Sequence, residues 1–393
     1  MLQTLLQNSR SRTLALLAVY RAALGGALRV PPCTTLNPPL WELGHIAWFQ
    51  DYWLSSNPER ACGQHATLQQ PRMASRLPEA DALYDSSQVA HTARWHLPLP
   101  DLESTLQYAQ QVLGDSLALL NSGLVGDDAL YFFRLALFHE DMHCEAWLYM
   151  AQTLGMAIPT ELLFTHARAA DAAGHLDVEL HLPAGPWRAG WQGGGFAFDN
   201  ELSSHTEALP ACAIDSRAVT WQRYLPFVEA GGYREEGWWS AAGWQWLQIQ
   251  NAMTPRYVRR GCTGTAWEHC EGGQWRALDP AAAAVHLSYF EAQAWCAWTG
   301  RALPTEAQWE RAALQHPNFD WGEVWEWTSS PFAPYPGFVA HPYRDYSAPW
   351  FDGRPVLKGA SPATHSRMSH PRYRNYFEPQ RNDVPAGFRS CKK

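Results

Sequence analysis

Two histidines and a glutamate on one short segment offer the clearest metal-binding chemistry in the sequence. The segment reads His139-Glu-Asp-Met-His143-Cys-Glu145, and no Pro or Gly occurs from residue 131 to 150. On a helix of 3.6 residues per turn, His139 and His143 lie one turn apart on one face, so both imidazoles can bind one ion. Glu145 lies roughly 160° from His143 around the helix and is a poorer ligand. His-x3-His alone is equally consistent with a pair that binds nothing.

A third histidine changes this balance. His45 lies among the apolar residues of segment 40–54, where an unpaired imidazole would be costly. A hydrogen-bonded core histidine is one interpretation, but a site of three histidines accounts for His45 and the pair together. Three neutral ligands leave three positions open on an octahedral metal, which suits a non-haem Fe(II) centre that binds a substrate and O2. Catalytic Zn(II) is the competing interpretation.

The elements that must position these histidines are helices. Helical periodicity and few breakers predict four of them, at about 3–28, 38–56, 101–121 and 127–154. Asp101 stands at the start of the third, and Asp127 and Asp128 stand where an N-cap for the His-bearing helix would lie. We therefore expect a four-helix bundle over residues 1–165, and the core of such a bundle commonly holds a metal.

The second half of the chain follows a different pattern. Residues 166–180 look like a linker, and residues 181–393 alternate short strands with Gly, Pro and Trp. Only 292–300 and 306–314 are convincing helices there. The predicted fold class is α+β, with a helical bundle followed by a loop-rich domain.

Composition narrows the function classes. A chain of 393 residues favours two domains, and a net charge of −8 without a Lys or Arg block argues against nucleic acid. No uncharged apolar stretch is long enough to span a membrane. The run after Arg10 and Arg12 is broken by Arg21, which favours a first helix over a signal peptide. Eight cysteines without a CxxC motif predict reduced thiols and a cytoplasmic protein.

The second half resembles the formylglycine-generating-enzyme (sulfatase-modifying-factor) fold, a C-type-lectin-like domain. The matching stretches are Phe198-Asp-Asn-Glu201, Glu229-Ala-Gly-Gly-Tyr233, Leu287-Ser-Tyr-Phe-Glu-Ala-Gln-Ala-Trp-Cys296, Gly300-Arg-Ala-Leu-Pro-Thr-Glu-Ala-Gln-Trp-Glu310, Trp325-Glu-Trp-Thr328, Tyr373-Arg-Asn375 and Gly387-Phe-Arg389. The formylglycine enzymes carry two cysteines before the Arg-Tyr-Arg segment, whereas residues 364–374 have none here. Peptide oxidation is therefore not expected, and the fold is expected to shape a small-molecule pocket.

A DinB-like bundle carrying His…His-x3-His ahead of that fold is similar to the EgtB family, the iron-dependent sulfoxide synthases of ergothioneine biosynthesis. The resemblance covers nearly the whole chain and implies that His45, His139 and His143 bind iron. It also implies hercynine, a chalcogen donor and O2 as substrates.

Departures from that family concern the donor. Family members that use γ-glutamylcysteine grip its carboxylates with loop arginines, but Arg94 is the only arginine in loop 84–100. The family's Asn-Trp-Asp cluster becomes Asn375-Tyr376-Phe377, and the Gln that often precedes the last ligand becomes Met142. These changes remove groups suited to a zwitterionic thiol, and the sequence is most similar to the selenoneine synthase (SenA) branch. The implied donor is a selenosugar, which has hydroxyls and no carboxylate.

Other residues receive roles from the same resemblance. Tyr335 and Tyr84 are candidate proton donors, and ordinary packing is the alternative role for each. Phe332 takes the position of the family's catalytic Tyr, which argues against sulfoxide-type chemistry. Asn375 is expected to orient the hercynine carboxylate with help from Arg372. The trimethylammonium group requires aromatic walls, for which Trp325, Tyr376 and Phe377 are candidates.

Three alternatives to selenium transfer stay open at this point. The first is an ergothioneine-type sulfoxide synthase that uses cysteine or γ-glutamylcysteine. The second is a zinc-dependent thiol S-transferase, because DinB-like bundles with three histidines can serve that role. The third is a non-catalytic binding module built on the second fold.

Overall fold

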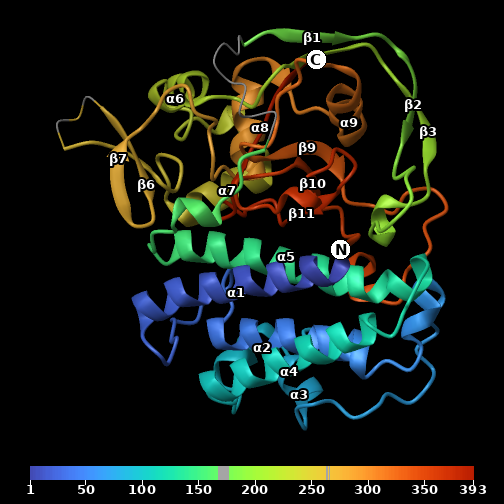
Figure 1. Cartoon of the computed structure of the whole chain (residues 1–393). Helices are drawn as coiled ribbons and strands as arrows, with labels where there is room; N and C mark the ends of the chain where they lie inside the picture. The colour runs from blue at the N-terminus through green and yellow to red at the C-terminus, as the bar shows by residue number, and fades with distance from the viewer. Residues whose placement is uncertain (167–176, 263, 265) are drawn as a thin grey trace. The chain divides into compact units, whose positions relative to one another are not determined.

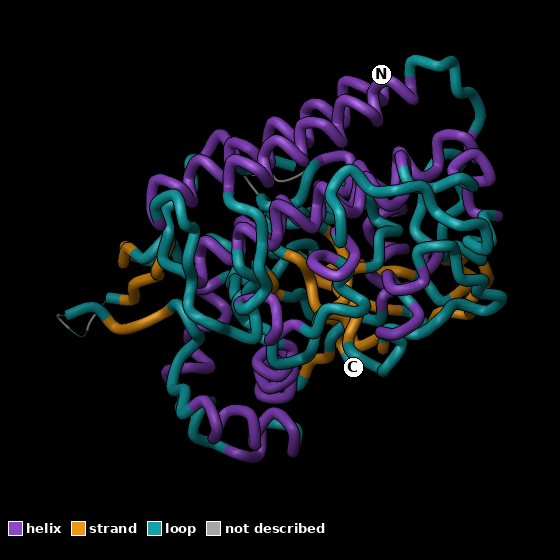
Figure 2. The backbone as a smooth tube through the Cα atoms, turned by 90° about the horizontal axis from the view of Figure 1, so that it is seen from below, coloured by secondary structure: helices purple, strands orange, loops and turns teal. Residues whose placement is uncertain are grey.

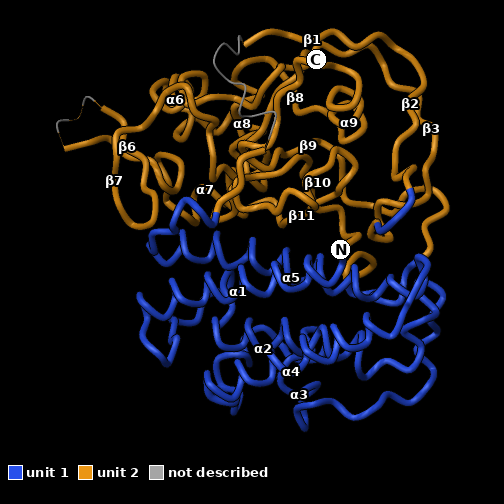
Figure 3. Tube along the Cα trace, in the orientation of Figure 1, with its two compact units in different colours: residues 1–162, 194–196, 340–345 blue, residues 163–193, 197–339, 346–393 orange. Residues whose placement is uncertain are grey.

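The computed structural model describes residues 1–166, 177–262, 264 and 266–393 of the chain. They form two compact units, coloured separately in Figure 3. The first comprises Met1–Leu162, Gly194–Phe196 and Ala340–Asp345, and the second comprises Leu163–Gly193, Ala197–Val339 and Tyr346–Lys393. The expected linker falls mostly on residues 167–176, which lie outside the described residues, and its last two residues belong to strand β1.

Helices that follow the four predicted ones build the first unit. The α-helices are α1 (Leu2–Leu24), α2 (Pro39–Gln50), α3 (Ala80–Tyr84), α4 (Leu102–Leu120) and α5 (Asp127–Thr153). Short 3-10 or π segments occupy Asp51–Ser55, Arg60–His65, His91–Trp95 and Thr160–Leu162. The long helices α1, α2, α4 and α5 pack side by side (Figure 1). The four predicted helical segments are confirmed.

Local capping explains where two of these helices begin. Asp101 caps α4, and its Oδ1 accepts a hydrogen bond from the Ser104 amide at 2.8 Å. The N-cap of α5 is Gly126, whose φ of 93° suits glycine. Asp127 and Asp128 therefore occupy the first turn rather than the predicted cap position, where their charges favour the helix dipole.

One buried arginine joins all four long helices. Arg10 on α1 donates from Nε to Glu140 Oε1 on α5 at 2.8 Å. It also donates to Gln50 Oε1 on α2 at 2.8 Å and to the Ala109 carbonyl on α4 at 2.5 Å. Because the side chains of Arg10 and Glu140 are only 4% and 3% exposed, this ion pair is a true core interaction.

Short strands and long loops dominate the second unit (Figure 2). One sheet has the order β1-β4-β13-β8, and another has the order β11-β10-β9-β12, while β2-β3 and β5-β6-β7 form separate antiparallel sheets. The strands are β1 (Glu179–Leu182), β2 (Gly185–Ala189), β3 (His205–Leu209), β4 (Cys212–Asp215), β5 (Val258–Arg260), β6 (Trp267–Glu271), β7 (Gln274–Ala277), β8 (Arg301–Ala302), β9 (Trp325–Pro331), β10 (Pro355–Gly359), β11 (Asn375–Tyr376), β12 (Ala386–Gly387) and β13 (Cys391–Lys392). The expected α+β class is confirmed.

Helices in the described part of the second unit outnumber the prediction. They are α6 (Trp221–Glu229), α7 (Ala241–Gln250), α8 (Tyr289–Trp298) and α9 (Glu306–Gln315). The two predicted helices correspond to α8 and α9, which start with capping boxes at Ser288 and Thr305. The prediction missed α6 and α7, because Pro226 and Gly243 inside them suggested breaks.

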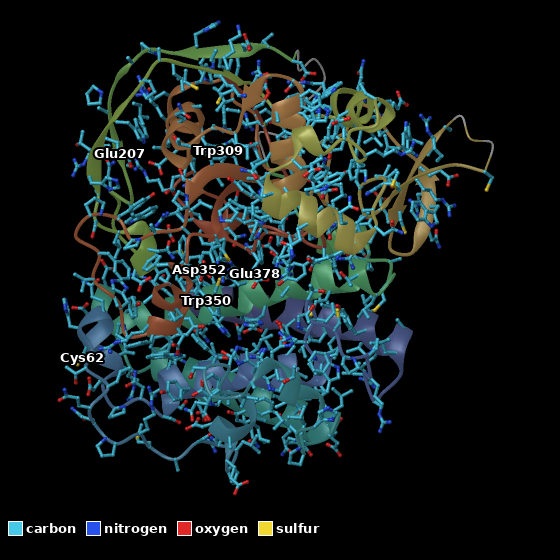
Figure 4. The ribbon with its side chains drawn as sticks, turned by 180° about the vertical axis from the view of Figure 1, so that it is seen from behind. Cys62, Glu207, Trp309, Trp350, Asp352 and Glu378 are labelled. Carbon is cyan, nitrogen blue, oxygen red and sulfur yellow. The ribbon has the colours of Figure 1, made fainter. Side chains whose placement is uncertain are left out.

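An apolar core holds the second unit together around α9. Trp309, labelled in Figure 4, is fully buried and belongs to one cluster with Ile214, Phe319 and Cys391. All eight cysteines of the chain are free thiols, as expected. Among the described residues, no helix is both long and apolar enough to cross a membrane.

Candidate metal centre

The first unit brings the three predicted histidines together. The ligand nitrogens of His45, His139 and His143 all lie within 4.8 Å of one another. The two Nε2 atoms of His139 and His143 are 3.1 Å apart. His45 and His139 are buried, and His143 is half-buried. Glu145 does not belong to this cluster.

Helix periodicity explains the convergence. On α5, His139 and His143 are separated by four residues and share a face, as predicted. On α2, which packs against α5, the same spacing places Trp41, His45 and Phe49 on one face, with Glu42 beside them. The face of α2 that carries His45 therefore also carries Trp41 and Phe49, with Glu42 beside it.

Hydrogen bonds fix the tautomers of two imidazoles. His45 Nδ1 lies 2.8 Å from the Tyr84 carbonyl, which can only accept, so Nδ1 carries the proton and Nε2 keeps its lone pair. His143 Nδ1 lies 2.5 Å from Glu42 Oε1, and a carboxylate likewise only accepts. In the neutral form of each imidazole, Nε2 is therefore the nitrogen that can bind a metal.

Burial keeps the imidazoles of His45 and His139 neutral. Desolvation, assisted by the nearby His143, lowers the pKa of His45 to about 3. The same two causes lower the pKa of His139 well below its usual value. Neutral imidazoles are the form that binds metal.

Two features of this cluster fit a divalent metal. The facing Nε2 atoms of His139 and His143 lie 3.1 Å apart, so the lone pairs of both could bind one ion. The Nδ1 atom of His139 is buried without a hydrogen-bond partner, so no donor at Nδ1 holds the ring in the tautomer whose Nε2 is protonated. Three nitrogen ligands suit Fe(II) with open positions, and they also suit Zn(II).

Aromatic rings hold the imidazoles in place. Trp41 stacks on His45 with ring centroids 4.8 Å apart, and Phe49 stacks on His139 at 3.5 Å. Tyr343, from the segment 340–345, packs edge-on against Phe49 at 4.9 Å and lies 6.3 Å from the His139 ring. No local pattern predicts this position of Tyr343, because the residue lies about two hundred positions beyond His139 in the chain.

Glu42 is the residue of this centre that sequence reasoning missed. Its side chain is 0% exposed and contacts His143 directly. Burial would raise its pKa, but the proximity of His143, His45 and Arg94 outweighs burial and lowers the pKa, so Glu42 is a carboxylate. Its position three residues before His45 was the available signal, because that spacing shares a helix face.

The other predicted residues of the first unit lie close to this centre. Tyr84 is fully buried, and its ring fills the space where a Cβ on Gly44 would lie. Burial raises the pKa of Tyr84 to about 12. Arg94 donates to Asn37 Oδ1 at 2.8 Å, and its guanidinium stacks 4.0 Å above the Trp41 ring. Met142 is half-buried on α5.

Tyr335 and Arg372 lie in buried ionic networks of the second unit. The Tyr335 hydroxyl donates to Glu306 Oε2 at 3.2 Å, and the guanidinium of Arg374 stacks 4.0 Å above its ring. Arg372 donates to Glu310 Oε1 at 3.0 Å and to the Gly190 carbonyl.

The aromatic candidates of the second unit have well-packed surroundings. Asn375 Oδ1 accepts from the Tyr376 amide at 2.9 Å, and Tyr376 stacks on Phe332 at 4.0 Å. Arg381 lies over the Phe377 ring at 5.1 Å. Trp325 is 1% exposed.

The chain is similar to known proteins, both in part and over nearly its whole length. Residues 165–322 match the family model described as sulfatase-modifying factor enzyme 1-like domain. The hercynine oxygenase of Mycobacterium tuberculosis is 30% identical over 435 aligned positions, covering 98% of this chain and 96% of the relative. That of Mycolicibacterium smegmatis is 29% identical and covers 90% of each chain. The formylglycine-generating enzyme of Streptomyces coelicolor is 29% identical over 37% of this chain and 50% of its own.

Proposed function

We propose that this chain, which belongs to the hercynine oxygenase family, joins the imidazole ring of hercynine to a selenosugar in an Fe(II)- and O2-dependent reaction. The expectation of an enzyme of this family is confirmed. The observation that carries the proposal is the cluster of three imidazoles whose ligand atoms lie within 4.8 Å of one another.

His45, His139 and His143 would hold the iron. Iron(II) bound there would supply the centre at which O2 is reduced and the chalcogen becomes reactive toward the ring. In the coupling, a C–H and an Se–H bond are replaced by a C–Se bond, and O2 accepts the two electrons and two protons that are released, which gives H2O2. The surrounding rings of Trp41 and Phe49 exclude water and keep the imidazoles from rotating.

The side chains that could contact the donor indicate its chemical class. Arg94 is the only arginine of loop 84–100, and one of its amino groups already donates to Asn37. Its Nε is buried without a hydrogen-bond partner and would suit a sugar hydroxyl as acceptor. Met142, beside the ligand His143, presents an apolar side chain where a polar one would favour a zwitterion. These features favour a donor without carboxylates.

Hercynine recognition is proposed for residues of the second unit. Asn375 would orient the carboxylate, with Arg372 as the nearby cation. Trp325, Tyr376 and Phe377 would supply the ring faces that attract a trimethylammonium group. Tyr335 and Tyr84 are the proposed proton donors. The Tyr335 hydroxyl is already bonded to a carboxylate, and the raised pKa of Tyr84 keeps its hydroxyl protonated at neutral pH.

A sulfur donor is the second candidate function. The relatives that cover the chain are named hercynine oxygenases, and their similarity does not favour selenium over sulfur. In that case cysteine or γ-glutamylcysteine would replace the selenosugar. A zinc-dependent S-transferase would use the same three histidines without O2. The expected cytoplasmic location stays a prediction.

A competition assay tests the proposal. The iron-loaded protein is given hercynine, O2 and equal amounts of selenosugar, γ-glutamylcysteine and cysteine, and the products are identified by mass. We expect the selenosugar adduct to dominate, and a dominant thiol adduct would overturn the selenium assignment. Absence of any O2-dependent adduct would overturn the coupling reaction. Activity with Zn(II) under anaerobic conditions would instead support the S-transferase.

A further inference from the structure

A chain of polar contacts runs from the surface side of the first unit to the ligand His143. Arg94 donates to Asn37 Oδ1 at 2.8 Å, and Asn37 Nδ2 donates to Glu42 Oε2 at 2.9 Å. Glu42 Oε1 accepts from His143 Nδ1 at 2.5 Å. Each oxygen of the Glu42 carboxylate therefore has its own N–H donor, and its orientation is set from both sides.

This arrangement matches what a metal-binding imidazole requires. An imidazole binds a metal through one nitrogen only if the other nitrogen carries the proton. A carboxylate that accepts this proton's hydrogen bond fixes both the tautomer and the ring plane, and it makes the imidazole a stronger electron donor. His45 Nδ1 donates a corresponding hydrogen bond to the Tyr84 carbonyl, which carries no charge. Among the described residues, His143 is the ligand with a carboxylate partner.

The buried Glu42 carboxylate requires partners that stabilise its negative charge. Its side chain is 0% exposed, and an uncompensated carboxylate in such a place is strongly unfavourable. A divalent ion on the three histidines would supply positive charge one imidazole ring away. The carboxylate and the ion would then stabilise each other through His143.

We propose that Glu42, held in place by Asn37 and Arg94, is a positioning residue that fixes His143 for metal binding. This inference rests on the proposed function only in taking the three histidines as metal ligands. It adds that part of the metal affinity resides in residues that never touch the metal.

Arg94 also reaches the centre by a second route. Its guanidinium stacks 4.0 Å above Trp41, and Trp41 stacks on His45 at 4.8 Å with an interplanar angle of 10°. Arg94 thus supports the surroundings of two ligands, His143 through Asn37 and His45 through Trp41. This role is compatible with donor binding through its Nε, which makes no hydrogen bond in the structure.

Metal affinity without substrate is the direct test. Dissociation constants for Fe(II) and Co(II) are measured anaerobically, by chelator competition, on the full chain and on E42A, E42Q and N37A. We expect E42A to weaken binding about 10- to 100-fold, as for other groups that orient metal ligands. E42Q keeps an acceptor oxygen but loses the charge, so its affinity should fall between E42A and wild type. N37A should weaken binding less than E42A, because it loosens Glu42 without removing it.

Glu140→Gln is the matched control. Glu140 is also a buried carboxylate on a bundle helix, but its partners are Arg10 and Thr13 rather than a histidine. Its variant should bind Co(II) as wild type does, even if it is less stable. The visible absorption spectrum of the cobalt form is a second readout, which should shift in E42Q and remain unchanged in E140Q. Wild-type affinity and an unchanged spectrum in E42Q would overturn the proposal, even if E42A failed to fold.

Arg94→Met separates the two roles of that residue. The contact network predicts weaker Co(II) binding with no substrate present. A residue that only grips the donor would leave Co(II) binding unchanged, which would remove Arg94 from the proposal. Failure of the proposed function is distinguishable, because it would appear as a wild-type protein that binds metal but forms no product.

Discussion

Each imidazole of the centre is held by a different kind of neighbour. A backbone carbonyl holds His45, a carboxylate holds His143, and a stacked ring holds His139. Sequence reasoning found the three histidines, because residue type and spacing identify ligands. It did not find Glu42 or Tyr343, since an acid in an apolar helix and a distant tyrosine show their partners only in three dimensions.

Gly44 offers a test at the residue scale. A Cβ at this position would lie 2.2 Å from the Tyr84 ring, and Tyr84 is the residue whose carbonyl holds His45. We expect G44A to lower the free energy of unfolding by about 1–3 kcal/mol through overpacking, measured by urea denaturation.

Gly114 on α4 provides the matched control for that prediction. It is also a helix glycine, but a Cβ there would meet nothing within 4 Å. G114A should therefore raise the free energy of unfolding by about 0.5–1 kcal/mol. Equal effects of the two substitutions would contradict the close packing of Tyr84 on α2.

The elements of the first unit were predictable because long amphipathic helices carry strong local signals. The second unit was harder to predict, since most of its strands are short. The order of the strands in its sheets depends on pairings between segments that are distant in the chain. Strand β13 at the end of the chain, for example, pairs with both β4 and β8. Such pairings leave no periodic pattern in the sequence.

Substitution of Arg10 tests how strongly its buried contacts hold the four long helices together. Because it is bonded to α5, α2 and α4 from α1, R10A would leave the Glu140 carboxylate buried without its cation. We expect a loss of about 3–5 kcal/mol in the free energy of unfolding. R134A removes the partly exposed ion pair with Asp127 and should cost less than about 1 kcal/mol. Similar losses in the two variants would show that the Arg10 contacts are weak.

The whole molecule combines two units, and the first recruits the segment 340–345 from the far end of the chain. This recruitment supplies Tyr343 to the surroundings of His139. No local pattern predicts it, because the segment is a loop whose partners lie two hundred residues away. The division at residue 165 expected from the sequence stays a prediction.

Buried histidines should make the molecule sensitive to acid. Burial, together with the nearby His269, lowers the pKa of His286 to about 3. The unfolded chain takes up a proton at an ordinary pKa of about 6.5, so stability falls as the pH drops from 6.5 towards 3. Within that window, His286 lowers the free energy of unfolding by about 1.4 kcal/mol for each pH unit of acidification.

His286→Asn tests this contribution, because asparagine tolerates the positive φ of 61° at this position. We expect a shallower decline of the urea midpoint between pH 6 and pH 4 in the variant than in wild type. An identical decline would show that His286 is protonated in the folded protein.

The central claim is that His45, His139 and His143 hold an iron that supports coupling of hercynine to a chalcogen donor. The most direct measurement loads wild type and H45A with Fe(II) anaerobically, determines bound iron, and then admits O2 with hercynine and the donors. We predict about one iron per chain and an O2-dependent adduct for wild type, and neither for a folded H45A, because two histidines alone hold Fe(II) weakly. Stoichiometric iron in H45A, or iron-loaded wild type that forms no adduct, would contradict the claim.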